Sequence, residues 1–260
     1  MSLLNSISNR FPGLYNRKLH VYGIGAAKTG TTSLSAIFGR KFRAAHESDV
    51  QRLNHFLIRY LSGDLDYTGM KDILLERDKK LKLDVEASHP MGYLSDILVE
   101  SFPRALFIIT MREPYSWLRS RLNFHIKLDP SEWREYREFF WTNRQGEYDK
   151  RELLLKRYGL CSLDIYLSQY ADHYQRVLAS VPAKRRLIIR TDELASSLGK
   201  IANFVGVPEC LLQNAHSNRE AKKIEILSEM DSDFVRERIW LNCGNLIKEY
   251  FPEVLRRYEQ

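Results

Sequence analysis

A glycine- and threonine-rich run near the N-terminus has the residue types and spacing of a phosphate-binding loop. Residues 23–34 read GIGAAKTGTTSL and follow a short strand-like stretch. Gly25 and Gly30 have the spacing of the glycines in a Walker-type loop, and Thr32 occupies its Ser/Thr position. The glycines allow a tight turn that aims backbone N–H groups inward, and the following helix adds the partial positive charge of its N-terminus. The run therefore predicts a cradle for a phosphate group.

The lysine of this loop lies elsewhere than in enzymes that hydrolyse ATP. Thr31 stands where a Walker loop needs its lysine, and Lys28 is the only cation inside the loop. This exchange disfavours a P-loop kinase or NTPase, which stays the second hypothesis for function. An ordinary strand, turn and helix with a solvated lysine is a simpler explanation. The density of glycine and hydroxyl residues argues against it.

A second apolar run ends in another group of polar residues. Residues 105–111 read ALFIITM, as expected for a parallel strand buried on both faces, and residues 112–120 read REPYSWLRS. In this order, and each after its own strand, the two motifs resemble those of the sulfotransferase superfamily. That family uses 3′-phosphoadenosine-5′-phosphosulfate (PAPS) and releases adenosine 3′,5′-bisphosphate (PAP). The resemblance implies that the first motif holds the 5′-phosphosulfate, while Arg112 and Ser120 hold the 3′-phosphate. Taken alone, Arg112 fits a surface ion pair and Ser120 an ordinary helix residue.

The resemblance covers residues 18–125 and 160–220. Residues 86–94, EASHPMGYL, are similar to the family's region after the third strand, although His89 before the proline is a departure. Residues 186–194, RLIIRTDEL, are similar to the family's last core strand and its acidic ending. The agreement at several separated places makes a chance match to one motif a poor explanation.

A late basic segment completes the expected cofactor site. Residues 214–223, NAHSNREAKK, resemble a family loop that closes over the 3′-phosphate, with Arg219 and Lys222 as candidates. A solvated charged loop before a helix that starts near Glu225 explains the segment equally well. The cofactor residues that the resemblance implies are Ala27, Lys28, Thr29, Gly30, Thr31, Thr32, Ser33, Arg112, Ser120 and Arg219.

Sulfuryl transfer needs a cation at the leaving phosphate and a base for an acceptor hydroxyl. Lys28 is assigned to the 5′-phosphate and its bridging oxygen. Part of the family has a proposed general base shortly after the loop helix, and Glu47 in the segment AAHESD matches it. Cytosolic relatives instead use a histidine after the third strand, which makes His89 a rival, with Glu86 beside it. The simpler explanations are a solvated carboxylate for Glu47 and a structural imidazole for His89.

Two further groups near these candidates are given less weight. Alternation along an extended chain predicts that His46 and Asp49 point away from the site. His125 lies in the segment where the family builds its acceptor cover, so it too can face the acceptor.

Strand-like and amphipathic runs alternate along the chain, which predicts a three-layer α/β/α fold around a mostly parallel, five-stranded, P-loop-like sheet. Ligands bind such sheets at the carboxyl ends of the strands, where both phosphate motifs fall. The expected strands are 19–25, 42–46, 81–85, 105–111 and 186–190. The expected helical stripes lie within 34–38, 53–61, 94–102 and 163–181.

The chain of 260 residues is interpreted as a single sulfotransferase domain, 1–260, because no linker, repeat or low-complexity block divides it. Residues 124–158 form the exception: they are rich in aromatic residues and match no motif. We expect a helical insert there, on the acceptor side. Most of its aromatic residues are expected to pack the insert onto the body.

Composition limits the compartment and the partners. A hydrophobic fraction of 44% supports a sizeable core, and the net charge of +7 suits an anionic ligand. The basic residues are scattered, which disfavours nucleic acid. Three widely spaced cysteines indicate reduced thiols and no metal site, and no signal peptide or spanning helix is evident, which points to the cytoplasm. The acceptor is expected to be a small molecule, sugar or lipid that accepts the sulfuryl group on a hydroxyl or an amine. A catalytically dead nucleotide-binding protein of the same fold is the third hypothesis.

Overall fold

Five short parallel strands form the centre of the protein. The computed structural model describes residues 15–127, 133–142, 146–215 and 225–258. The strands are β1 (Val21–Gly23), β2 (Ala44–His46), β3 (Val85–Ala87), β4 (Leu106–Met111) and β5 (Arg186–Arg190). They pair in the order β2-β3-β1-β4-β5, and every pairing is parallel. The predicted α/β fold with a parallel five-stranded sheet is therefore confirmed.

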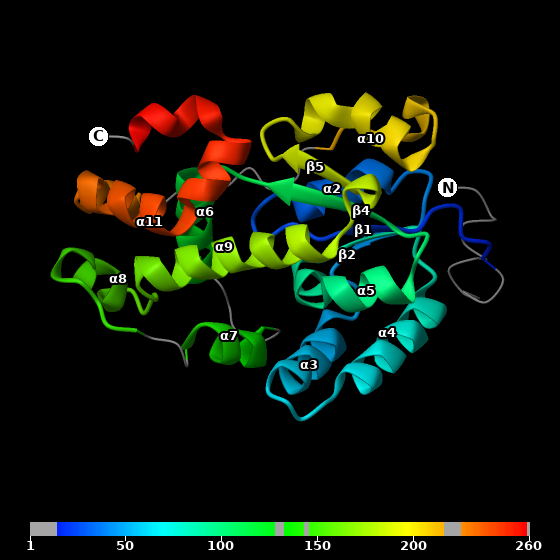
Figure 1. Cartoon of the computed structure of the whole chain (residues 1–260), viewed down its shortest axis with the longest axis horizontal. Helices are drawn as coiled ribbons and strands as arrows, with labels where there is room; N and C mark the ends of the chain where they lie inside the picture. The colour runs from blue at the N-terminus through cyan, green and yellow to red at the C-terminus, as the bar shows by residue number, and fades with distance from the viewer. Residues whose placement is uncertain (1–14, 128–132, 143–145, 216–224, 259–260) are drawn as a thin grey trace.

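The two faces of the sheet carry separate hydrophobic cores, because successive strand residues point to opposite sides. Val21 and Ile108 belong to the smaller core, whereas Tyr22 and Phe107 belong to the larger one. Figure 1 shows α9 crossing the sheet on the side away from α10. The smaller core is covered by α2 (Thr31–Phe38) and α10 (Leu198–Val205), and the larger one chiefly by α5 (Ser95–Ser101), α6 (Pro114–Lys127), α9 (Leu163–Ser180) and α11 (Ser232–Tyr250).

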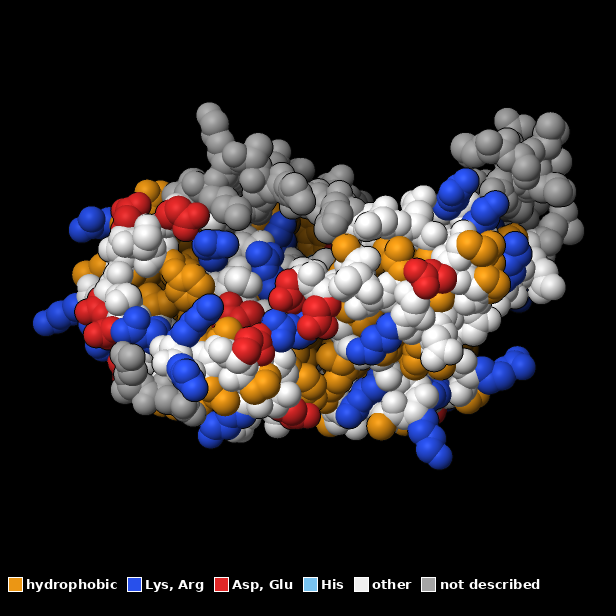
Figure 2. Space-filling view, turned by 90° about the horizontal axis from the view of Figure 1, so that it is seen from above, with side chains coloured by type: hydrophobic (Ala, Val, Ile, Leu, Met, Phe, Trp, Pro, Cys, Tyr) orange, Lys and Arg blue, Asp and Glu red, His pale blue; other side chains and the backbone are white. Residues whose placement is uncertain are grey.

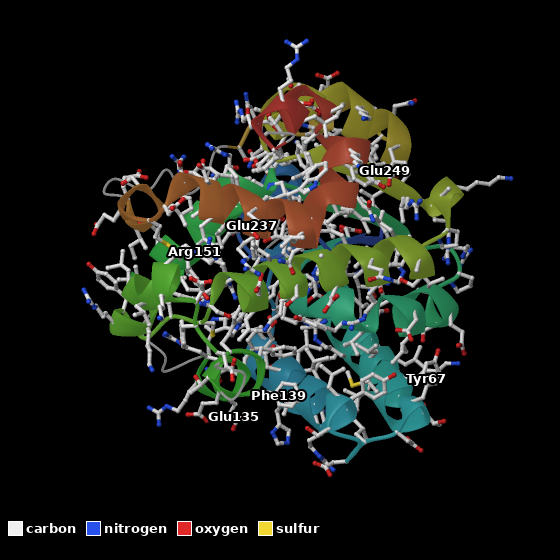
Figure 3. The ribbon with its side chains drawn as sticks, turned by 60° about the vertical axis from the view of Figure 1, so that its left-hand side comes forward. Tyr67, Glu135, Phe139, Arg151, Glu237 and Glu249 are labelled. Carbon is white, nitrogen blue, oxygen red and sulfur yellow. The ribbon has the colours of Figure 1, made fainter. Side chains whose placement is uncertain are left out.

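The insert lies against the larger core. Its helix α7 contacts α3, where His55 lies 3.9 Å from Glu135. Arg151 reaches Glu237 of α11 at 3.8 Å (Figure 3). The remaining α-helices are α3 (Val50–Leu61), α4 (Tyr67–Leu81), α7 (Arg134–Phe140) and α8 (Leu153–Arg157). Short 3₁₀ turns are η2 (His89–Leu94), η4 (Lys150–Glu152), η5 (Ala183–Arg185), η6 (Leu194–Ser197), η7 (Glu209–Leu211), η8 (Ile226–Glu229) and η9 (Pro252–Arg257).

Two expectations about the elements were wrong. The third strand does not run over 81–85, because α4 continues to Leu81 and Lys82 then takes a left-handed φ of 44°. The third strand is β3 (Val85–Ala87), and its charged residue Glu86 can be buried because it forms an ion pair with Arg77. A 3₁₀ turn, not an α-helix, follows Glu225, and α11 begins at Ser232.

The surface seen in Figure 2 intersperses Lys and Arg side chains with acidic and apolar ones. Among the residues that the structure describes, no helix is long and apolar enough to cross a membrane. The same residues hold no group of three or more His, Cys, Asp or Glu side chains placed to bind a metal. Cys161, Cys210 and Cys243 are free thiols.

Candidate functional site

The loop between β1 and α2 is held from one side through its carbonyl groups. Side chains from four distant segments, together with Thr29 itself, donate to it. Carbonyl acceptors and their donors are Ile24 with His173 Nε2 (2.9 Å), Ala26 with Thr29 Oγ1 (2.6 Å), Ala27 with Trp117 Nε1 (2.9 Å), Lys28 with Arg112 Nη1 (3.3 Å) and Thr29 with Thr191 Oγ1 (2.6 Å). In a trans peptide the N–H points opposite to the C=O. Anchoring these carbonyls therefore turns the N–H groups that follow most of them to the other side of the loop.

Local backbone conformation forms the same concave turn. Lys28 and Gly30 adopt left-handed φ values of 69° and 101°. A Cβ at Gly25 would overlap the backbone and side chain of Thr110 and lie 2.7 Å from Thr29 Oγ1, so this position requires glycine. Helix α2 starts at Thr31 with no side-chain cap and no acidic residue in its first turn. Its N-terminus therefore keeps the donors and partial charge that attract an anion.

The second predicted motif meets the loop at the carboxyl end of β4. Arg112 follows this strand directly, and its Nη1 contacts the Lys28 carbonyl, so two motifs 84 residues apart form one site. Arg112 Nε also donates to Ser116 Oγ at 3.0 Å. Ser120 lies one helical turn beyond Ser116 on α6 and is buried. The structure therefore brings Lys28, Arg112 and Ser120 to one edge of the sheet.

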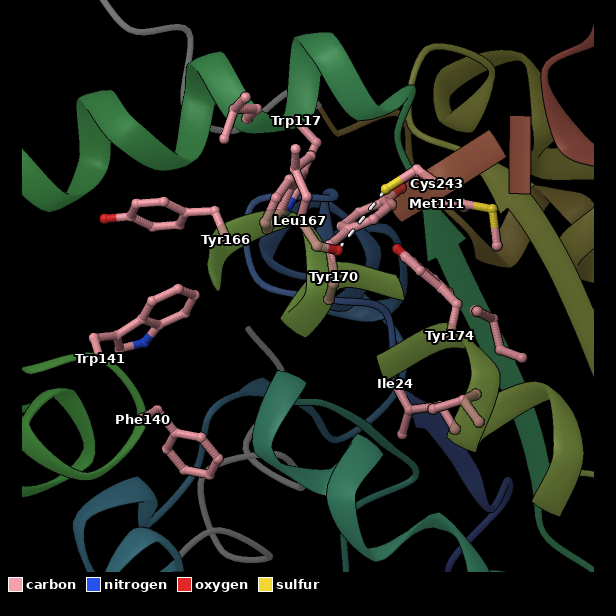
Figure 4. Packing of buried hydrophobic residues seen from close by; sticks show 14 of the residues in the cluster. Ile24, Met111, Trp117, Phe140, Trp141, Tyr166, Leu167, Tyr170, Tyr174 and Cys243 are labelled. Atoms are coloured by element: carbon pink, nitrogen blue, oxygen red, sulfur yellow. Dashed lines mark hydrogen bonds between the residues drawn. The ribbon is translucent and has the colours of Figure 1, made fainter. Parts of the chain in front are cut away.

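Two tyrosines of α9, Tyr170 and Tyr174 (Figure 4), hold the end of β4 through their hydroxyl groups. Tyr174 donates to the Thr110 carbonyl at 2.8 Å, and Tyr170 donates to the Arg112 carbonyl. Both side chains are buried, as is His173 between them, which holds the loop. Sequence periodicity marked these positions as an apolar stripe, but it gave no sign of their polar contacts.

The two rival bases, Glu47 and His89, are hydrogen-bonded to each other. Glu47 Oε1 lies 2.7 Å from His89 Nδ1. Glu47 follows β2 with a left-handed φ of 53°, and His89 begins η2 just after the neighbouring β3. The ring of His89 stacks on Trp133 at 5.3 Å, and its Nε2 is buried without a hydrogen-bond partner in the described part of the chain. Burial alone would raise the pKa of Glu47, but the hydrogen bond and charge of His89, with nearby His46 and Arg121, hold it below its ordinary value.

His46 does not point away from the site, so the expectation from strand alternation was wrong. The strand ends at His46 and the left-handed residue after it breaks the alternation. His46 Nε2 lies 3.7 Å from Glu47 Oε1 and hydrogen-bonds with the hydroxyls of Thr31 (3.0 Å) and Thr32 (3.3 Å). Burial lowers the pKa of this imidazole, which links the loop to the Glu47–His89 pair as a neutral group.

The remaining candidates are engaged elsewhere or lie outside the described residues. Glu86 is buried and forms an ion pair with both terminal nitrogens of Arg77. His125 Nδ1 hydrogen-bonds with Tyr166 OH at 2.7 Å, and burial lowers the pKa of His125 well below its ordinary value. Arg219 and Lys222, with the rest of residues 216–224, lie outside the part of the chain that the structure describes.

Comparison with known families identifies the family of this chain. The profile of the family described as "Sulfotransferase domain" matches residues 20–222, which is most of the chain. The chain belongs to the sulfotransferase family. This confirms the predicted family, and membership implies PAPS-dependent sulfuryl transfer. It leaves the acceptor unidentified.

A solved sulfotransferase structure shares the fold at low sequence identity, and a second match is more distant in structure. One from Mycobacterium avium has a TM-score of 0.56 and 13% identity, covering 95% of this chain and 81% of the other. One from Alicyclobacillus acidocaldarius has a TM-score of 0.47 and 17% identity, covering 87% and 96% respectively. A search of curated proteins found no match to this sulfotransferase.

Several residues that position the sulfotransferase site were not found from its sequence. The loop anchors Trp117, His173 and Thr191 come from three separate segments, and none belongs to a contiguous motif with the loop. Trp133, which stacks on His89, was noted only as one of many aromatic residues in the insert. Arg121 is a buried arginine next to Ser120, and only its place in the second motif's helix could have drawn attention to it.

Proposed function

We propose that this sulfotransferase moves the sulfuryl group of PAPS to a hydroxyl group of a small acceptor and releases PAP. The observation that carries the proposal is the contact between the two motifs, in which Arg112 Nη1 donates to the carbonyl of Lys28. Through this contact Arg112, a second cation, lies beside the loop that carries Lys28. A nucleotide with phosphates at the 5′ and 3′ positions of its ribose requires two such phosphate-binding groups at one edge of the sheet.

The residues of the loop and of α6 fit such a donor. Lys28, with the N–H groups of the loop and of the first turn of α2, would hold the 5′-phosphosulfate, and Arg112 with Ser120 the 3′-phosphate. Thr29 has a different part: its hydroxyl and N–H both bond to Ala26, so it braces the loop. PAPS supplies an activated sulfuryl group on a phosphate leaving group. Donors that are already in place stabilise the charge that grows there without reorganisation.

We propose that His89 takes the proton of the acceptor hydroxyl through Nε2, while Glu47 holds Nδ1–H. The carboxylate orients the ring and stabilises the imidazolium that forms, as in other carboxylate–histidine pairs. A lowered pKa keeps Glu47 ionised, which suits this orienting part and makes it a weak base by itself. Glu47 acting directly as the base is the alternative reading of the same hydrogen bond.

Nucleotide binding tests the proposal without an acceptor. We expect PAP to raise the thermal midpoint of unfolding more than ATP with Mg²⁺ does, because the loop lacks the Walker lysine and Arg112 lies beside it. A ligand at a hundredfold excess over its Kd adds about 2.7 kcal/mol to the free energy of unfolding. Transfer of labelled sulfate from PAPS to a pooled set of hydroxyl compounds, with and without EDTA, tests catalysis and the expected independence from metal. A larger shift with ATP, or activity that EDTA abolishes and Mg²⁺ restores, would contradict the proposal.

A further inference from the structure

One buried arginine near the proposed base has no charged partner. Arg121, on α6, is 5% exposed, and its Cζ lies 4.8 Å from the ring of Trp141 and 5.7 Å from that of Phe124. Its Nε is buried without a hydrogen-bond acceptor. Among the residues that the structure describes, no carboxylate forms an ion pair with it, and Glu47 acts on it only through space. Burial lowers the pKa of Arg121, so its environment does not favour the charge.

Another buried arginine of the same chain shows the usual solution. Arg77, 8% exposed, donates to both carboxylate oxygens of Glu86 and to the carbonyl of Ser48. Its Nε, like that of Arg121, has no partner among the described residues, so the two arginines differ in the ion pair that Arg77 forms. Burying an arginine without such partners is costly, because the lost hydration is not replaced. Aromatic rings recover only part of it. The described part of the chain therefore fixes the position of Arg121 but supplies no counter-charge for it.

The surroundings of Arg121 place it beside the transfer site. The ring of Phe124 also lies 4.7 Å from Lys28 Nζ, so the loop lysine and Arg121 share one aromatic neighbour. Other buried polar atoms here also have no partner in the described residues: His89 Nε2 and Trp141 Nε1. Native proteins leave few such atoms, and a group of them calls for a ligand or ordered water.

We propose that Arg121 binds an anionic oxygen group of the acceptor, so that the acceptors are hydroxyl compounds carrying a carboxylate, phosphate or sulfate. This rests on the proposed sulfuryl transfer, because it names the substrate of the same site. The planar guanidinium can donate two parallel hydrogen bonds to such a group, and the flanking rings limit its orientation. The acceptor's negative charge supplies the missing partner of Arg121, while its hydroxyl group meets His89.

Matched pairs of hydroxy acids and their methyl esters test the charge preference. We take 4-hydroxyphenylacetate, 3-hydroxybutyrate and gluconate with their esters, and measure binding to the PAP-saturated enzyme by calorimetry. The wild type should prefer at least one acid over its ester by about 30-fold or more, the usual effect of a buried charge-assisted contact. In Arg121→Met this preference should vanish, and in Arg121→Lys it should be partly kept. Equal binding of acid and ester, binding of neither, or an unchanged preference in Arg121→Met would overturn the proposal.

Two controls separate this proposal from its neighbours. PAP affinity, measured in the same preparation, tests the proposed function independently, and it should be unchanged in Arg121→Met. The difference in affinity between PAPS and PAP should be unchanged too. A loss for PAPS alone would show that Arg121 holds the donor's sulfuryl oxygens, and it would overturn the acceptor assignment.

Stability without any ligand gives a second readout. Arg121→Met removes a buried charge that lacks a partner, so the thermal midpoint of the free enzyme should stay the same or rise by a few degrees. Arg77→Met is the matched control, because it leaves Glu86 buried and unpaired, and its midpoint should fall by roughly 10 °C. A comparable fall in Arg121→Met would make Arg121 a structural residue and overturn the proposal.

Discussion

The loop side of the site and the base side are built in opposite ways. The loop side comprises residues 24–33 with Arg112 and Ser120, and the carbonyls of residues 24 and 26–29 accept hydrogen bonds from side chains. The base side comprises Glu47, His89 and Arg121, where Nε2 of His89 and Nε of Arg121 are buried without partners in the described chain. On the loop side, the protein itself supplies the hydrogen-bond partners. On the base side, the described residues leave these two atoms without partners, so a ligand can supply them.

This difference follows from what each half must bind. A phosphate group is met by N–H donors, and such donors can be aimed in advance by holding the carbonyls behind them. A base and an acceptor-binding cation must meet groups of the substrate directly. Their polar atoms therefore cannot be used up inside the protein. We therefore expect the unpartnered polar atoms of the base side to reduce the stability of the free protein, and a bound ligand to restore it.

The largest expected effect breaks the base side while leaving the loop side intact. His89→Asn and Glu47→Gln should each lower turnover by about 10²–10⁴-fold, the usual contribution of general-base catalysis, with PAP affinity nearly unchanged. If His89 takes the proton, imidazole added to the buffer should partly restore His89→Ala but not Glu47→Ala. Steady-state rates and calorimetry measure both quantities. Near-wild-type turnover in His89→Asn with loss in Glu47→Gln would move the base to Glu47.

A smaller effect breaks the loop side. Arg112→Ala removes a charge-assisted contact to phosphate and should weaken PAP binding by about 2–4 kcal/mol. Lys28→Ala should reduce both PAPS affinity and turnover, because its charge meets the phosphate before and during transfer. Arg190→Ala is the matched control, since Arg190 ends the neighbouring β5 but pairs with Glu253 and Asp192. Calorimetric affinity equal to that of the wild type in folded Arg112→Ala would remove this residue from the cofactor site.

The sequence predicts the loop side better than the base side, for a physical reason. The loop's ligand groups are contiguous, so glycine spacing, Lys28 and the strand before Arg112 are visible in short windows. The pairing of Glu47 with His89 depends on β2 and β3 being neighbours and on a left-handed residue at the end of β2. Neither is encoded in a local pattern. Residue spacing does not reveal that Glu47 and His89 are in contact, so the sequence analysis named them as rival bases.

The same limit explains the misplaced third strand. Glu86 lies in the middle of β3, and a buried carboxylate in a strand contradicts the apolar pattern of a parallel sheet. Its partner Arg77 lies on α4, a helix that the sequence analysis did not anticipate. Long-range ion pairing and the side-chain anchors from α9 become visible only when the chain is folded.

The dependence of stability on pH tests whether the loop side is held as rigidly as its contacts indicate. Burial lowers the pKa of His173 to about 4, although its hydrogen bond to the Ile24 carbonyl opposes the shift. The unfolded chain binds this proton below pH about 6.5 and the folded protein only below about 4, so the contribution of His173 is complete above 6.5 and is lost as the pH falls to 4. The loss is on the order of 3 kcal/mol.

Urea unfolding at pH values from 7 to 4 measures this loss directly. His46 and His125 have lowered pKa values and add to the same trend, so only part of the slope belongs to His173. His173→Gln keeps a donor for the Ile24 carbonyl and cannot be protonated, so it should flatten the pH dependence and retain PAP binding. If His173→Gln loses PAP affinity at pH 7 and keeps the full slope, then the anchor is not neutral. The loop would in that case be held through charge, and not only by the hydrogen bonds that distinguish it from the base side.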